Sequence, residues 1–130
     1  RMTLRRYTLA KAERLSWDRH INRLFAEGQS FVSFPLRVVY LETDDPVVPP
    51  VSMLISVPKK RFRRAVKRNL IKRQVREVYR VRKYDLIDPL EEKQKKLMVA
   101  FLYIDQTIHP FRDMEKAMNK AIRVLRERMA

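Results

Sequence analysis

Apolar side chains recur at helical spacing in three parts of the chain, and each part predicts an amphipathic helix. The first lies between Ser16, which can serve as N-cap, and Gly28, the only glycine, which we expect to end the helix in a left-handed conformation. Its apolar positions are Trp17, Ile21, Leu24 and Phe25. The second, residues 65–83, lacks proline and glycine, and one side carries Leu70, Ile71, Gln74, Val75 and Val78. The third opens at Pro110 and continues with Phe111, Met114, Met118, Ala121 and Leu125.

Three other segments are rich in the β-branched, aromatic and aliphatic residues that favour strands: residues 36–42, 51–57 and 97–104. The last is almost continuously apolar, which is typical of a central strand buried on both faces. Prolines between the first two strands predict an exposed loop, and the charged residues 88–96 also predict a loop. We therefore expect an α+β fold, a single-domain α/β sandwich over residues 1–130 in the order α-β-β-(β)-α-β-α, where the bracketed strand is short and optional.

The net charge of the chain limits the kinds of partner that such a domain would bind. Lys and Arg number 30 against 15 for Asp and Glu, giving a formal net charge of +15 and a pI near 10.7. Residues 1–14 form a basic arm with little to offer a core. Nucleic acid, an anionic membrane or an acidic protein could each balance this excess, and its clustering favours nucleic acid.

Several chemistries are disfavoured by the residues present. The chain has no cysteine, so it can form neither disulfides nor thiolate zinc sites, and a reducing cytoplasm is the expected location. No apolar run approaches the roughly 20 residues needed to span a bilayer. His20, placed on the polar side of the first helix, and His109 are isolated along the chain, while Asp44 and Asp45 fit a solvated turn. We expect no catalytic residue and no metal site in the protein.

The most basic segment offers a binding surface instead. At about 100° per residue, five polar residues of the second helix fall within roughly 100° of arc, opposite its apolar side. We call them the polar ridge: Asn69, Lys72, Arg73, Arg76 and Arg80. Only Glu77 is nearby to pair with these charges, whereas a merely solvated face usually carries both signs. Guanidinium groups suit phosphate because they donate two parallel hydrogen bonds.

The same segment resembles the signature of the bacterial ribonuclease P proteins, in which a strand ending Ser-Val leads through Lys-Lys to a helix carrying Arg-Asn-Arg and Lys-Arg. The matching residues, in register and without a gap, are Ser56, Val57, Lys59, Lys60, Ala65, Val66, Arg68, Asn69, Lys72, Arg73 and Arg76. Phe25, Gly28 and Ser30 match the family's first helix and the start of its sheet. Leu70 replaces the family's second arginine and Ile21 its first aromatic residue, which removes one phosphate contact and one stacking platform.

The resemblance implies a ribosomal protein S5 domain 2-like sandwich with a left-handed βαβ crossover. It also implies that the chain is the protein subunit of a ribonucleoprotein enzyme, in which the ribonuclease P RNA, with Mg²⁺, removes the 5′ leader of precursor tRNA. The resemblance further implies that the chain needs no obligate protein partner and does not associate with a membrane. The RNA-binding residues would then be Lys59, Lys60, Arg64, Lys67, Arg68, Asn69, Lys72, Arg73, Arg76 and Arg80. The leader would lie in a cleft formed by Ile21, Phe25, Tyr40, Arg68 and Asn69, with Val39 replacing Tyr40 if the register across Pro35 differs.

Three other classes of protein are alternatives to this interpretation. A ribosomal-type or chaperone-like RNA-binding protein would share the charge and could share the fold, but not the string from Val57 to Arg76. A protein-only nuclease should show clustered carboxylates or histidines, and the sequence has none. A membrane-surface protein is the least favoured, because the apolar stripes suit a core.

Overall fold

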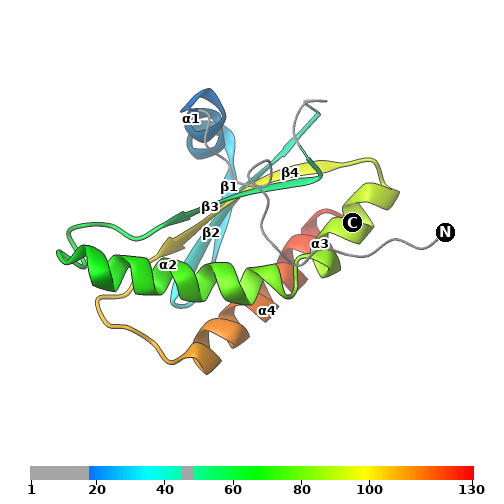
Figure 1. Cartoon of the computed structure of the whole chain (residues 1–130). Coiled ribbons are helices and arrows are strands. Elements are labelled where there is room, and N and C mark those ends of the chain that lie inside the picture. The colour runs from blue at the N-terminus through cyan, green and yellow to red at the C-terminus, as the bar shows by residue number, and fades with distance from the viewer. Residues whose placement is uncertain (1–17, 45–48) are drawn as a thin grey trace.

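The computed structural model describes residues 18–44 and 49–130, which form one four-stranded sheet with helices on both faces (Figure 1). The strands are β1 (Gln29–Ser33), β2 (Leu36–Thr43), β3 (Val51–Ser56) and β4 (Lys96–Tyr103), in the spatial order β1-β2-β4-β3. The additional short strand is β1, which precedes the two predicted strands, whereas the predicted order had the optional strand after them. β4 is central and buried, as the sequence predicted. The basic arm, Ser16, Trp17 and Asp45 lie outside the described residues.

The pairing of the strands is mixed. β1 with β2 and β2 with β4 are antiparallel, whereas β3 and β4 are parallel neighbours. Parallel neighbours require a crossover connection, and here it runs through two helices. The left-handed sense that the resemblance implies for this crossover stays a prediction.

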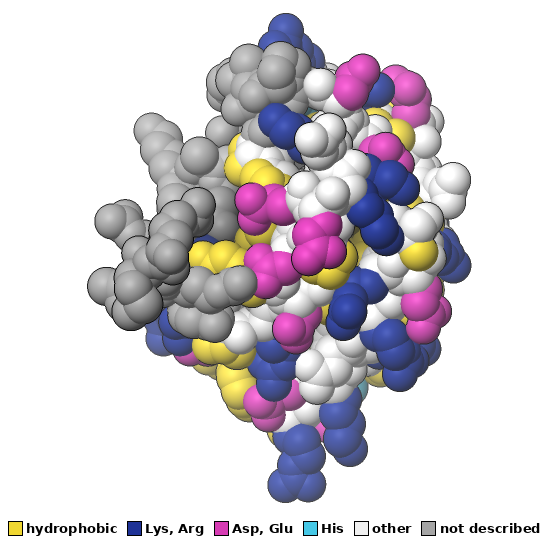
Figure 2. Space-filling model, turned by 90° about the vertical axis from the view of Figure 1, so that its right-hand side faces the viewer, with side chains coloured by type: hydrophobic (Ala, Val, Ile, Leu, Met, Phe, Trp, Pro, Cys, Tyr) yellow, Lys and Arg dark blue, Asp and Glu magenta, His cyan; other side chains and the backbone are white. Residues whose placement is uncertain are grey.

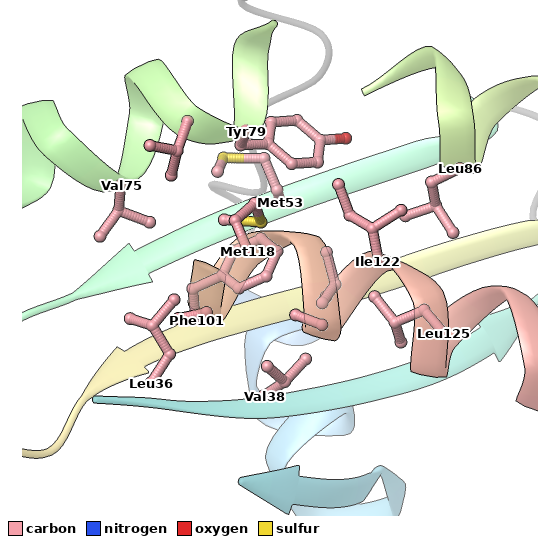
Figure 3. Packing of buried hydrophobic residues seen from close by; sticks show 14 of the residues in the cluster. Leu36, Val38, Met53, Val75, Tyr79, Leu86, Phe101, Met118, Ile122 and Leu125 are labelled. Atoms are coloured by element: carbon pink, nitrogen blue, oxygen red, sulfur yellow. The ribbon is translucent and has the colours of Figure 1, made fainter. Parts of the chain in front are cut away.

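Three helices cover one face of the sheet: α2 (Ala65–Arg80), α3 (Tyr84–Glu92) and α4 (Phe111–Arg128). Together they bury the main core, in which β2, β3 and β4 contribute Leu36, Val38, Met53 and Phe101 (Figure 3). The helices contribute Val75, Tyr79, Leu86, Met118, Ile122 and Leu125. The predicted stripe of α4 is buried except for Phe111, which is 41% exposed in the first turn.

The helix α3 is a correction to the sequence prediction, which placed a loop at residues 88–96 and ended the preceding helix at Lys83. Charged residues and Pro89 favoured the loop, but Leu86, Ile87 and Leu90 have helical spacing and are buried against the core. Their burial outweighs the backbone hydrogen bond that Pro89 cannot donate within the helix.

The helix α1 (Asp18–Glu27) lies on the opposite face, and it is the only helix of the described residues there (Figure 1). It is attached through a small second cluster, in which Leu24 packs with Val39, Met98 and Ala100. Ile21 is partly buried against the same cluster. This face is therefore covered much less by the described elements than the face bearing the main core.

Gly28 ends α1 for a different reason from the one predicted, because it does not adopt a positive φ. Its N–H donates to Leu24 O at 2.9 Å, so the chain turns directly from α1 into β1. A Cβ at this position would lie 2.3 Å from Leu24 O, 2.9 Å from Tyr40 O and 3.1 Å from Val39 Cγ1. Glycine is required here for the close approach of the helix to β2.

Three connections meet at one end of the sheet, because Ser33, Leu36, Ser56 and Tyr103 all lie there in register. They are the β1–β2 turn, the basic loop before α2 and the connection from β4 to α4. No helix among residues 18–44 and 49–130 is long and apolar enough to cross a membrane.

Candidate nucleic-acid interface

The helix α2 is oriented by its buried side, which consists of Ile71, Val75, Val78 and Tyr79. The polar ridge consequently faces outward: Asn69, Arg73 and Arg76 are exposed, and Lys72 and Arg80 are partly exposed. The predicted apolar stripe was wrong at one position, because Leu70 is 39% exposed. An aliphatic side chain thus lies on the outer surface of a basic helix.

The charges of the polar ridge are mostly unpaired within the described residues. Arg80 forms an ion pair with Glu77, which raises the pKa of Arg80 and lowers that of the Glu77 carboxyl through their hydrogen bond. No carboxylate among the described residues pairs with Lys72, Arg73 or Arg76. These three cations are free to receive phosphate groups.

Arg68 has a structural role that the sequence did not reveal. Its Nη1 atom donates to Phe62 O and to Arg63 O, each at 2.8 Å, and so holds the loop that leads into α2. The same loop is anchored by the buried Phe62 ring, which packs on Tyr103 with centroids 5.9 Å apart. Arg68 therefore orders the basic loop as well as adding charge to it.

The remaining predicted cations surround this loop and the start of α2. Lys59, Lys60, Arg64 and Lys67 are all exposed. Arg64 occupies the N-cap position of α2, and its side chain makes no capping hydrogen bond. The loop and the first turns of α2 thus extend the polar ridge toward the end of the sheet.

The three residues expected to form the leader platform are not all on one face of the sheet. Ile21 and Phe25 belong to α1, and the Phe25 side chain is 47% exposed. Tyr40 lies on the opposite face with the main core, where its hydroxyl accepts from Arg128 Nη1 at 3.0 Å and donates to Gln29 Oε1 at 2.9 Å. Val39, the alternative, lies beneath α1.

The prediction for Tyr40 was therefore wrong, and the cause is the two-residue period of a strand. The turn at Phe34 and Pro35 sets the register of β2, so that Leu36, Val38 and Tyr40 point to the main core. This alternation also brings an unforeseen residue, Arg37, to the α1 face, where it is exposed and donates to Ser30 Oγ at 3.4 Å. The alternation of residues along β2 could have identified Arg37, but only if the register of this strand after Pro35 had been known.

Neither histidine is in the setting that the sequence predicted. His20 is buried rather than on a polar surface. His109 lies between Asp105 Oδ2, 2.5 Å from its Nε2, and Asp113 Oδ2, 3.3 Å from its Nδ1. Burial opposes protonation of His109, but the two carboxylates outweigh it and the pKa is raised. Both ring nitrogens are occupied, so this cluster lacks the free nitrogen that a general base needs.

No group of three or more His, Cys, Asp or Glu side chains in the part of the chain that the structure describes is arranged so that it could hold a metal ion. The arrangement at α2 is instead suited to phosphate, with guanidinium and ammonium groups on one exposed surface and an amide among them.

Comparison with known proteins identifies the family to which the chain belongs. The family model "Ribonuclease P" matches residues 9–126. The ribonuclease P protein component of Porphyromonas gingivalis strain W83 is 48% identical over 116 residues, covering 89% of this chain and 85% of the relative. That of Chlorobium phaeobacteroides is 35% identical over 105 residues, covering 75% and 72%.

Solved structures show the same fold. The RNase P protein of Staphylococcus aureus superimposes with a TM-score of 0.70 at 21% identity, covering 88% of this chain and 95% of that one. That of Thermotoga maritima gives 0.65 at 23% identity, covering 85% and 96%. The α+β architecture is thus confirmed, and on the strength of the family model and the curated relatives this chain belongs to the ribonuclease P protein family.

Proposed function

We propose that this chain supports the RNA-catalysed removal of the 5′ leader from precursor tRNA by binding the ribonuclease P RNA and the precursor. Membership of the family supports the reaction. The observation that carries the binding role is the polar ridge, which is held outward by the buried side of α2 and has three cations without a carboxylate partner among the described residues.

The ridge and the preceding loop would bind the catalytic RNA. Phosphate contacts by Lys72, Arg73 and Arg76 displace counterions from the RNA, which gives affinity without sequence preference. Arg68, already bonded through Nη1 to two carbonyls, keeps Nη2 and Nε for such a contact and fixes the loop carrying Lys59 and Lys60. A prearranged loop loses less conformational entropy on binding than a free one.

The precursor's leader would bind on the α1 face of the sheet. This face offers the half-exposed ring of Phe25, the partly buried Ile21 and the cationic end of Arg37. Aromatic stacking holds single-stranded bases with little sequence preference, and a guanidinium group can hold the phosphate between them. Val39 takes the place first given to Tyr40 as part of the floor beneath α1.

Catalysis itself would rest with the RNA and its Mg²⁺ ions, in the cytoplasm. Cations placed beside two RNA strands reduce the repulsion between them, so the protein can raise precursor affinity and strengthen Mg²⁺ binding by the RNA without providing a ligand.

The test is cleavage of precursor tRNA at low Mg²⁺ by a bacterial ribonuclease P RNA, with and without this protein. We expect strong stimulation by the protein and no cleavage at the mature 5′ end by the protein alone. An RNA that gains nothing from the protein would contradict the proposal, and a ribosomal-type or chaperone-like role would then be favoured.

A variant separates the polar ridge from general charge. Replacing Lys72, Arg73 and Arg76 by Ala should weaken RNA binding by several kcal/mol, at roughly 1.5–3 kcal/mol for each charge-assisted hydrogen bond lost. Arg68 is left intact because it also holds the loop. Unchanged RNA affinity in a natively folded variant would show that the ridge is only a solvated face.

A further inference from the structure

A second line of cations lies on α4, on the opposite side of that helix from its buried residues. Five exposed side chains fall within roughly 120° of arc at about 100° per residue. We call them the α4 stripe: Arg112, Lys116, Lys120, Arg123 and Arg126. On the side of the molecule shown in Figure 2, Lys and Arg side chains protrude at the lower edge, at the level where Figure 1 places the first turns of α4.

The carboxylates of α4 do not neutralise this stripe. Asp113 turns to His109, and Glu115 forms an ion pair with Arg82 at 2.9 Å, which ties the end of α2 to α4. Only Glu127 remains on the exposed side, near the end of the helix. No member of the α4 stripe has a carboxylate partner among the described residues. A solvated helix face would more commonly alternate charges of both signs.

The stripe ends at a hollow shared by two helices. Its volume is about 400 Å³, and its cations are Lys93, which follows α3, with Arg123 and Arg126 of α4. Glu127 also lines it, so the hollow presents three positive groups and one negative group. Cations that converge on one hollow from separate elements can bind a single anionic group, such as a phosphate, more tightly than scattered surface cations bind counterions.

We propose that the α4 stripe and this hollow form a second RNA-binding site, which takes the phosphate backbone of a further RNA segment. From Arg112 to Arg123 the helix rises about 17 Å, which is eleven steps of roughly 1.5 Å, long enough to follow several phosphates. α2 and α4 cover the same face of the sheet and are bridged by Arg82, so the stripe and the polar ridge share one helical layer. Two lines of contact fix the orientation of a bound RNA, whereas one line leaves it free to pivot.

The inference rests on RNA binding by this chain, so the test includes both surfaces. In the stripe variant, Arg112, Lys116, Lys120 and Arg123 are replaced by Gln, which keeps helix propensity at four exposed positions. The ridge variant carries the alanine changes described above. Affinity for ribonuclease P RNA is measured for both and for the unaltered protein across a range of salt concentrations.

The logarithm of the binding constant falls linearly with the logarithm of the salt concentration, by roughly 0.7–0.9 for each phosphate contact. We therefore expect this dependence to be shallower by about 3 in the stripe variant, and binding to be weaker by at least about tenfold. Glu127→Gln removes a negative charge beside the stripe instead of a positive one, so it should tighten RNA binding about twofold. If the stripe variant binds exactly as the unaltered protein does while the ridge variant is weakened, the second site is wrong and the proposed function stands. If only the ridge variant binds normally, the proposed role of α2 fails instead.

A positional experiment distinguishes local contact from a general effect of net charge. The chain has no cysteine, so Lys120→Cys or Asp44→Cys provides a single attachment point for a photo-crosslinker. Both positions are exposed, and Asp44 follows β2 at the end of the sheet opposite to the basic loop. We expect crosslinking to the RNA from position 120 and not from position 44. Equal crosslinking from both, or none from position 120, would overturn the site.

Discussion

Replacing Gly28 by alanine should destabilise the protein, although the same change at an unconstrained glycine usually stabilises by roughly 0.4–1 kcal/mol. The added Cβ would lie 2.3 Å from Leu24 O and 2.9 Å from Tyr40 O, and both are backbone atoms that no side-chain rotation can move. Overpacking of this kind costs roughly 1–3 kcal/mol, and loss of the 2.9 Å hydrogen bond from Gly28 N–H to Leu24 O adds about 1 kcal/mol. The net loss should be about 2–3 kcal/mol.

Thermal unfolding measures this loss directly. At roughly 3–5 °C per kcal/mol for a chain of this size, Tm should fall by about 6–15 °C. Ala26→Gly is a matched control, because Ala26 is exposed on α1 and its replacement costs only helix propensity, about 1 kcal/mol. Because the clash moves α1 away from β2, precursors with long leaders should also bind more weakly. A Tm equal to or above that of the unaltered protein would refute the reasoning from close approach.

Three further predictions concern single side chains. Phe25→Ala should weaken binding of precursors with several leader nucleotides and spare those with one, since stacking acts only where a base reaches the ring; equal losses with a lower Tm would indicate a structural role instead. Tyr40→Phe should cost about 1–2 kcal/mol of stability by removing the hydroxyl shared by its two partners, yet leave leader affinity unchanged; a selective loss of leader affinity would put Tyr40 back on the α1 face. Because the pKa of His109 is raised in the folded protein, protonated His109 should add to the free energy of unfolding. This contribution should be complete below the pKa of the unfolded chain, about 6.5, and should be lost as the pH rises through the pKa of the folded protein. His109→Gln should flatten urea-unfolding stability over that pH window, and an unchanged pH profile would contradict the assignment.

The sequence predicted those elements in which the spacing of the apolar residues fits either a helix or a strand but not both. α1, α2 and α4 were recognisable from their three- and four-residue spacing, and β4 from its continuous apolar run. α3 was missed because Pro89 and neighbouring charges suggest a loop, while its three buried residues form too short a pattern to outweigh them. Local propensity was a poorer guide there than burial against the core.

The candidate site was predictable where it lies on a single helix and less so where it depends on register. The polar ridge follows from the geometry of one helix, so its outward orientation was confirmed once the buried side of α2 was known. Tyr40 and Arg37 belong to β2, where a shift of one residue exchanges the two faces. The bonds of Arg68 to the loop and of His109 to its carboxylates join groups that composition alone does not bring together.

The strand order has a consequence for how the protein is made. β4 lies between β2 and β3, although it is the last strand to be synthesised. A nascent chain leaves the ribosome N-terminus first, so β2 and β3 have no common neighbour until residues 96–103 emerge. The basic residues 59–80 are by then already outside, carrying their charge before the sheet that orients α2 can close. A chain that stops before residue 96 would therefore keep its attraction for RNA and lack the fold that gives this attraction a direction.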